Sequence, residues 1–180
     1  MQYQHVYCIM EEGILYIADF IPEPHTLFDS LVTSVIWDES MAARKTASFG
    51  KAYNYSQIKY PYQALLPQLE TVNKKLAETL GFTPNNCLIN FYQDGKSKMG
   101  YHADQIDILE KDTGIAIVSL GETRKLKFRS ISNQEEFITY ELQSGSLIYM
   151  TQEIQQQWQH AIPPSKTALG RISLTFRQIK

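Results

Sequence analysis

The sequence has few cysteines and no long apolar run, and both absences exclude classes of protein. Of its 180 residues only Cys8 and Cys87 are cysteines, and neither belongs to a Cys-x-x-Cys pair. A zinc finger and a thiol redox motif are therefore excluded, and so low a count is typical of a reducing compartment. No uninterrupted apolar run approaches the roughly 20 residues that span a bilayer. Because Glu11 and Glu12 interrupt the N-terminal region, we expect no signal peptide, and a cytoplasmic protein with no membrane segment.

The sequence also has no large excess of positive or negative charge. The formal net charge is -2 and the isoelectric point is about 6.1. These values argue against a protein that coats nucleic acid non-specifically, although local patches can still bind phosphate. The hydrophobic fraction of 43% is ordinary for a globular chain, and the length suits a single domain, residues 1–180. A chain of this length can bury a core without disulfides or a structural metal. Any metal is therefore expected to be functional.

Hydrophobic periodicity divides the chain into two regions. Residues 1–86 combine a strand at 13–20 with two amphipathic helices, at 26–37 and 61–80, and are expected to form an N-terminal helical or lid region. Residues 87–180 are expected to form a β-rich core, because their many short strands and turns indicate a sandwich, a barrel or a jelly roll. The two helices would cover one sheet from outside. The expected strands of the core are 87–93, 99–104, 114–121, 124–130, 136–142, 145–150, 157–162 and 170–178.

The last of these strands has two chemically different faces. Side chains alternate between the faces of a strand, which separates the polar set Arg171, Ser173, Thr175 and Arg177 from the apolar set Ile172, Leu174 and Phe176. The helices need an apolar sheet face on which to pack. We therefore expect the apolar set to meet the helices and the two arginines to line a cavity. The alternative is an edge strand with two solvated arginines.

His102, Asp104 and His160 are the candidate metal ligands. Residues two apart on a strand point the same way, so His102 and Asp104 would converge on one side, and His160 lies within another expected strand. Two histidines and one carboxylate form the facial triad that holds Fe(II) and leaves coordination positions open. A His-x-Asp pair alone is weak evidence, because a histidine at a strand end and an aspartate in a turn are common.

Arg171 is the candidate anchor of a co-substrate. The planar guanidinium pairs in a bidentate manner with a carboxylate, and a buried arginine that faces a cavity needs an anion. 2-Oxoglutarate would supply one carboxylate to Arg171 while its keto-acid end binds iron. Asn90 and Tyr92 share one strand face and could donate hydrogen bonds to the same molecule. The alternative for this pair is a polar strand face with a partly buried tyrosine.

Seven blocks in this order resemble the AlkB family from about residue 88 to the end of the chain. The blocks are Asn90-x-Tyr92-x-Asp94-Gly95, Gly100-x-His102-x-Asp104, Val118-Ser119-Leu120-Gly121, Arg124-x-x-x-Phe128-Arg129, Ser144-Gly145-Ser146-Leu147, Trp158-x-His160 and Arg171-x-Ser173-Leu174-Thr175-Phe176-Arg177. The resemblance implies a mainly β fold, a double-stranded β-helix (jelly roll) whose two N-terminal helices pack on one sheet.

The same resemblance implies an enzyme that uses Fe(II), 2-oxoglutarate and O2 to demethylate alkylated nucleobases in DNA or RNA. Formaldehyde, succinate and CO2 would be released. Carried over residue by residue, it gives His102, Asp104 and His160 as catalytic iron ligands. It gives Asn90, Tyr92, Arg171 and Arg177 as residues that contact or support 2-oxoglutarate.

Residues 44–62 are the candidate substrate-binding segment. They are basic and aromatic, and no Asp or Glu occurs from Met41 to Gln68. Cations suit phosphate contact, and aromatic side chains suit base stacking in an enzyme that extrudes its base or takes a single strand. The alternative is a tyrosine-rich surface segment that packs on the sheet. The expected substrate contacts are Arg44, Lys45, Phe49, Tyr53 and Tyr55.

Two positions depart from the DNA-repair members that the chain resembles. Ile106 stands where those members usually carry an acidic residue, and Ala43 stands where a proline is common. Asp107 is adjacent, but a shift of one residue on a strand reverses the face, whereas a loop at this point could turn Asp107 toward the site. Three hypotheses follow: a nucleic-acid demethylase, a 2-oxoglutarate oxygenase of a protein or small molecule, and a non-enzymatic domain that has kept the fold. The complete triad and Arg171 argue against the third, and no obligate protein partner is evident.

Overall fold

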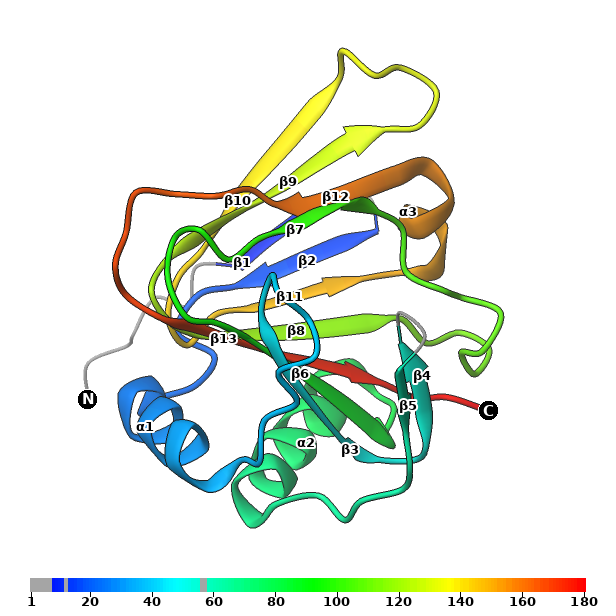
Figure 1. Cartoon of the computed structure of the whole chain (residues 1–180). Helices are drawn as coiled ribbons and strands as arrows, with labels where there is room; N and C mark the ends of the chain where they lie inside the picture. Colours follow the sequence, from blue (N-terminus) through cyan, green and yellow to red (C-terminus); the bar gives the residue numbers. More distant parts are fainter. Residues whose placement is uncertain (1–7, 12, 56–57) are drawn as a thin grey trace, which may run out of the picture.

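Two β-sheets face each other in the computed structural model, which describes residues 8–11, 13–55 and 58–180 (Figure 1). The larger sheet has the order β1-β2-β11-β8-β13-β6-β3, and the smaller sheet has the order β10-β9-β12-β7. The larger sheet contains β1 (Cys8–Glu11), β2 (Ile14–Ile17), β3 (Lys45–Gly50), β6 (Asn86–Tyr92), β8 (Ile115–Gly121), β11 (Leu147–Met150) and β13 (Arg171–Arg177). The smaller sheet contains β7 (Met99–His102), β9 (Arg124–Ser130), β10 (Phe137–Leu142) and β12 (Trp158–Ile162). The mainly β, jelly-roll class is confirmed.

Two helices cover the larger sheet on the side away from the smaller sheet (Figure 1). α1 (Pro24–Ser34) and α2 (Pro67–Leu80) bury Leu31, Leu69 and Leu76 in one apolar cluster with the apolar face of β13. The expected packing of the helices is therefore confirmed. None of the described helices is both long and apolar enough to cross a membrane.

Proline and glycine set the ends of α2. Leu66 is extended, because the residue before a proline avoids the helical region, and Pro67 then starts the helix about six residues later than the sequence predicted. Gly81 ends the helix, as expected, with a φ of 78° and its N–H bonded to the carbonyl of Ala77.

β13 lies in the middle of the larger sheet, between β8 and β6. The alternative of an edge strand with solvated arginines is therefore wrong: Arg171 and Arg177 are 1% and 2% exposed. The polar face of β13 points between the two sheets, and its apolar face points toward the helices. β13 thus places one buried arginine at each of its ends, and both arginines line the cavity between the sheets.

Five elements were not predicted. β1 pairs with β2 at one edge of the larger sheet. β3 extends the larger sheet beside β6, and β4 (Tyr53–Tyr55) and β5 (Ile58–Tyr60) form a separate hairpin near the C-terminal end of the chain (Figure 1). α3 (Gln152–Gln157) lies directly before β12. The larger sheet thus draws strands from both sides of residue 86, where the sequence placed the start of the β-rich core.

Candidate metal centre and co-substrate cavity

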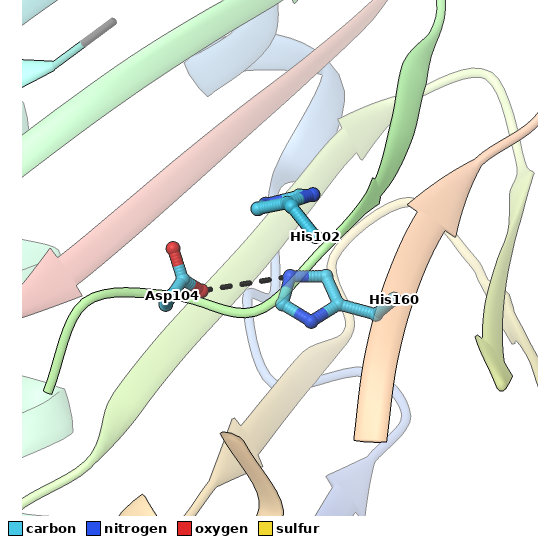
Figure 2. A group of neighbouring side chains, drawn as sticks. All are labelled: His102, Asp104 and His160. Carbon is cyan, nitrogen blue, oxygen red and sulfur yellow. Dashed lines mark ion pairs between the residues drawn. The ribbon is translucent and has the colours of Figure 1, made fainter. Parts of the chain in front are cut away.

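His102, Asp104 and His160 come together at one end of the space between the sheets (Figure 2). His102 ends β7, and its register partner on the neighbouring strand β12 is His160, so the two rings lie 4.4 Å apart. One ligand atom from each of the three residues lies within 4.8 Å of the others. Nε2 of His160 is 3.5 Å from Oδ2 of Asp104. This arrangement can hold a metal ion.

A β-bulge directs the side chains of β7. Met99 pairs with Ile162 and His102 pairs with His160, so β7 has two residues where β12 has one. Met99 and His102 therefore both line the cavity. Asp104 was expected on the same strand as His102, and this expectation was wrong, because pairing ends at His102 and Asp104 lies in the following loop. The loop, not strand alternation, brings its carboxylate back to the histidines.

α3 holds the loop that carries Asp104. Oε1 of Gln155, a side chain that is 4% exposed, accepts a hydrogen bond of 2.8 Å from the backbone N–H of Asp104. Nε2 of Gln152 donates to the carbonyls of Glu110 and Thr113, at 2.9 and 2.8 Å. Sequence reasoning missed this support. The run Gln152-Glu-Ile-Gln-Gln-Gln157 just before Trp158-x-His160 was the available signal, and it is not specific.

We expect Gln155→Leu to weaken metal binding by about 10- to 100-fold, the usual cost of losing a group that orients a metal ligand. The substitution leaves the Asp104 N–H without its acceptor and frees the loop. Anaerobic titration of the metal-free protein with Co(II) measures the affinity. Gln156→Leu is the matched control, because Gln156 lies on the same helix but is exposed. Equal affinities in the two variants would show that Gln155 does not position Asp104.

The charge states of the triad suit Fe(II). Burial alone would raise the pKa of Asp104, but Arg177 and the two histidines together hold it below its usual range. Nη2 of Arg177 donates to Oδ1 of Asp104 at 2.9 Å. Burial lowers the pKa of His160 to about 4, against the opposing effect of Asp104. At neutral pH the site thus presents an anionic carboxylate and a neutral imidazole, and the contact between them is not an ion pair.

Arg171 lies in the same cavity and forms no ion pair with any acidic residue that the structure describes. Its Nη2 donates to Oγ of Ser119 at 2.9 Å, while its buried Nε and Nη1 have no hydrogen-bond partner among the described residues. Burial lowers the pKa of Arg171 to about 10, so the guanidinium stays charged at neutral pH. A buried cation with two unsatisfied N–H groups is costly unless an anion binds it. The residues present therefore fit a carboxylate ligand such as 2-oxoglutarate.

All four residues expected to contact 2-oxoglutarate line this cavity. The guanidinium of Arg171 lies 5.2 Å from the ring centre of Tyr92, and Oδ1 of Asn90 accepts from Nε of Arg44 at 2.8 Å. Arg177 lies at the metal end, on Asp104. Sequence reasoning did not assign Ser119, although it lies in one of the blocks quoted above. The complete lining is Leu88, Asn90, Tyr92, Met99, His102, Asp104, Ile117, Leu126, Leu142, His160, Ile162, Arg171, Ser173, Thr175 and Arg177.

The structure separates the five expected substrate contacts. Arg44 is buried against Asn90, and the guanidinium of Arg177 lies 5.2 Å from the ring centre of Tyr53, so both adjoin the cavity. Lys45 and Phe49 do not reach it, because they lie on the face of β3 that packs toward the helices. There Nζ of Lys45 pairs with Glu39, and Phe49 is 2% exposed in the helix-side core. The side chain of Tyr55 lies outside the described residues.

Asp107, the acidic residue beside Ile106, does not take the place of the acidic residue expected at position 106. Ile106 is partly buried and packs against the inner core, whereas Asp107 is exposed. Asp107 lines a separate surface pocket with Tyr53 and Lys180, whose Nζ donates to the Asp107 carbonyl at 2.7 Å. The loop thus turns the Asp107 side chain away from the cavity that the triad lines.

Comparison with known proteins agrees with this geometry. Residues 30–177 match the model of the 2OG-Fe(II) oxygenase superfamily. The chain is 33% identical over 147 residues to "DNA oxidative demethylase ALKBH2" of Mus musculus, covering 76% of this chain and 62% of that protein. It is 30% identical over 179 residues to "Alpha-ketoglutarate-dependent dioxygenase alkB homolog 3" of Rattus norvegicus, covering 88% and 61%. The chain thus spans about three fifths of these relatives.

A solved structure shares the fold. OsALKBH1 superposes with a TM-score of 0.67 at 17% sequence identity, covering 98% of this chain and 99% of that one. The expected resemblance is confirmed: the chain belongs to the 2OG-Fe(II) oxygenase superfamily and is AlkB-like.

Proposed function

We propose that the protein is an Fe(II)- and 2-oxoglutarate-dependent dioxygenase that demethylates N-alkylated nucleobases of the 1-methyladenine and 3-methylcytosine type in DNA or RNA. The observation that carries the iron chemistry is the single cavity shared by the triad and the unsatisfied guanidinium of Arg171. The relatives named as a DNA oxidative demethylase support a nucleobase as the substrate.

The residues have separable tasks in this reaction. Bound Fe(II) would supply hydroxylation of a C–H bond with O2, as 2-oxoglutarate is converted to succinate and CO2. An N-hydroxymethyl group then breaks its C–N bond to give formaldehyde and the free base. Arg171 would bind the distal carboxylate of 2-oxoglutarate. Arg177 donates to Oδ1 of Asp104, so that Oδ2 of this carboxylate could hold the metal. Apolar residues such as Leu126 and Leu142 line the cavity between the triad and Arg171 and exclude water from it.

The test uses oligonucleotides that carry 1-methyladenine or 3-methylcytosine, as DNA and as RNA. The protein, reconstituted with Fe(II) without oxygen, receives 2-oxoglutarate, air and one oligonucleotide. Mass spectrometry measures the repaired base, and succinate is measured in parallel. We expect repair that follows succinate, with the DNA-to-RNA ratio identifying the polymer. Repair of neither base at any enzyme concentration, in a protein that produces succinate, would contradict the proposal.

A second candidate is a 2-oxoglutarate oxygenase of a protein or a small molecule. Ile106 favours it, because this apolar side chain stands where the DNA-repair relatives in the resemblance carry an acid. Succinate without base repair would direct the search to that class.

A further inference from the structure

The outer face of the smaller sheet carries a row of cations on β9. Leu126 and Phe128 point into the core and are 1% and 0% exposed. Lys125, Lys127 and Arg129 alternate with them and therefore point outward. We call these three residues the cationic face. It lies on the side of β9 opposite to Leu126, which lines the cavity between the two sheets, and Figure 1 shows the place of β9 in the smaller sheet.

These charges are not neutralised by the described part of the chain. The side chains of Lys125 and Lys127 form no ion pair or hydrogen bond with any described residue, and the guanidinium of Arg129 donates only to the neutral Oε1 of Gln159, at 3.0 Å. Glu141 is the single acid on the outer side of the smaller sheet's strands. It is the register partner of Lys125, yet the two form no ion pair. The cationic face therefore keeps a positive charge available to a ligand.

Aromatic side chains flank Arg129 on both sides. Phe137 is its register partner on β10 and is 53% exposed, and Gln159 is its partner on β12. On the far strand β7, the ring centre of Tyr101 lies 4.2 Å from the Arg129 guanidinium. Cations with interleaved aromatics are the chemistry that binds single-stranded nucleic acid. Tyr101 also connects this surface to the candidate metal site, because the next residue in the chain is the candidate metal ligand His102.

Two of the four cations in the segment expected to bind phosphate, residues 44–62, are engaged within the chain, and of the four only Lys51 and Lys59 are exposed. Arg44 is buried against Asn90, and Lys45 is paired with Glu39. We therefore propose that the cationic face, with Phe137 and Tyr101, binds the sugar–phosphate backbone and adjacent bases of the strand whose modified base enters the cavity. This inference rests on the proposed function, and it names the surface that would hold the polymer.

Binding of an unmethylated, labelled single-stranded oligonucleotide to the Fe(II) protein under nitrogen tests the inference apart from catalysis. Fluorescence anisotropy gives Kd at several salt concentrations. We expect the triple variant Lys125→Gln/Lys127→Gln/Arg129→Gln to raise Kd about tenfold or more and to lower the slope of log Kd against log salt by about 2, since each lost phosphate contact removes about 0.7. Phe137→Ala should raise Kd by roughly fivefold or more through lost stacking.

The matched control removes three charges elsewhere. Lys74→Gln/Lys75→Gln/Lys111→Gln changes exposed lysines on α2 and on the loop before β8, and it should bind like the wild type. Melting temperatures check that each variant is folded. Wild-type affinity and salt slope in the β9 variant, or an equal loss in the control, would overturn the inference. If base repair persists in that case, the proposed function stands. If the wild-type protein makes succinate but neither binds nor repairs nucleic acid, both the proposed function and this inference are wrong.

Discussion

His160→Ala is expected to abolish iron binding and 2-oxoglutarate turnover together. His160 is 3% exposed, and its low pKa keeps the imidazole neutral and able to bind a metal at neutral pH. Loss of an orienting group already weakens metal binding about 10- to 100-fold, so loss of a ligand should exceed roughly 100-fold. Co(II) titration measures the affinity, and succinate formed without nucleic acid measures the turnover.

His25→Ala is the control for His160→Ala. His25 lies exposed on α1, on the far side of the larger sheet from the triad, and its replacement should change neither quantity. A melting curve of the metal-free His160→Ala protein separates loss of the ligand from loss of the fold. Turnover of 2-oxoglutarate at the wild-type rate in His160→Ala would refute the assignment of the iron site.

Features that repeat along a strand could be predicted from the sequence. Alternation on β13 separated Arg171 and Arg177 from the apolar residues between them, and the helices were predicted to meet the apolar side. The burial of both arginines follows from the position of β13 between two other strands. No alternation pattern reports a strand's position within its sheet, which is why solvated arginines remained an alternative until the structure was considered.

Features that depend on contacts between distant residues could not be predicted. Gln155 holds the N–H of Asp104 across 51 positions of sequence, and α3 is a short glutamine-rich helix without apolar periodicity. Phe49, in contrast, was predicted to have a role in the site that the structure does not give it. Its place in a basic, aromatic segment predicted a substrate contact, but its strand face packs toward the helices, as only the pairing of β3 with β6 reveals.

Arg171→Met should separate binding of the co-substrate from binding of the metal. We expect the KM for 2-oxoglutarate to rise about 100-fold or more, because removal of one partner of a buried charge pair costs about 3–5 kcal/mol. The affinity for Co(II) should not change, because Arg171 forms no hydrogen bond or ion pair with the described residues of the triad. Arg171→Lys should give an intermediate KM, since it keeps the charge but loses the planar fork. An unchanged KM in Arg171→Met would place the co-substrate elsewhere.

The same variant should be at least as stable as the wild type when no ligand is present. The wild-type guanidinium is buried with two N–H groups unsatisfied by the described residues, and replacing such a cation with an apolar side chain is often neutral or stabilising. Arg124→Met is the contrast, because Arg124 donates to the carbonyls of Asp94, Ser97 and Pro163, and its loss should lower the melting temperature. Addition of 2-oxoglutarate should raise the melting temperature of the wild type and of Arg124→Met but not of Arg171→Met. Opposite effects of the two substitutions on the melting temperature would identify Arg171 as the buried arginine that binds a ligand and Arg124 as the one that stabilises the fold.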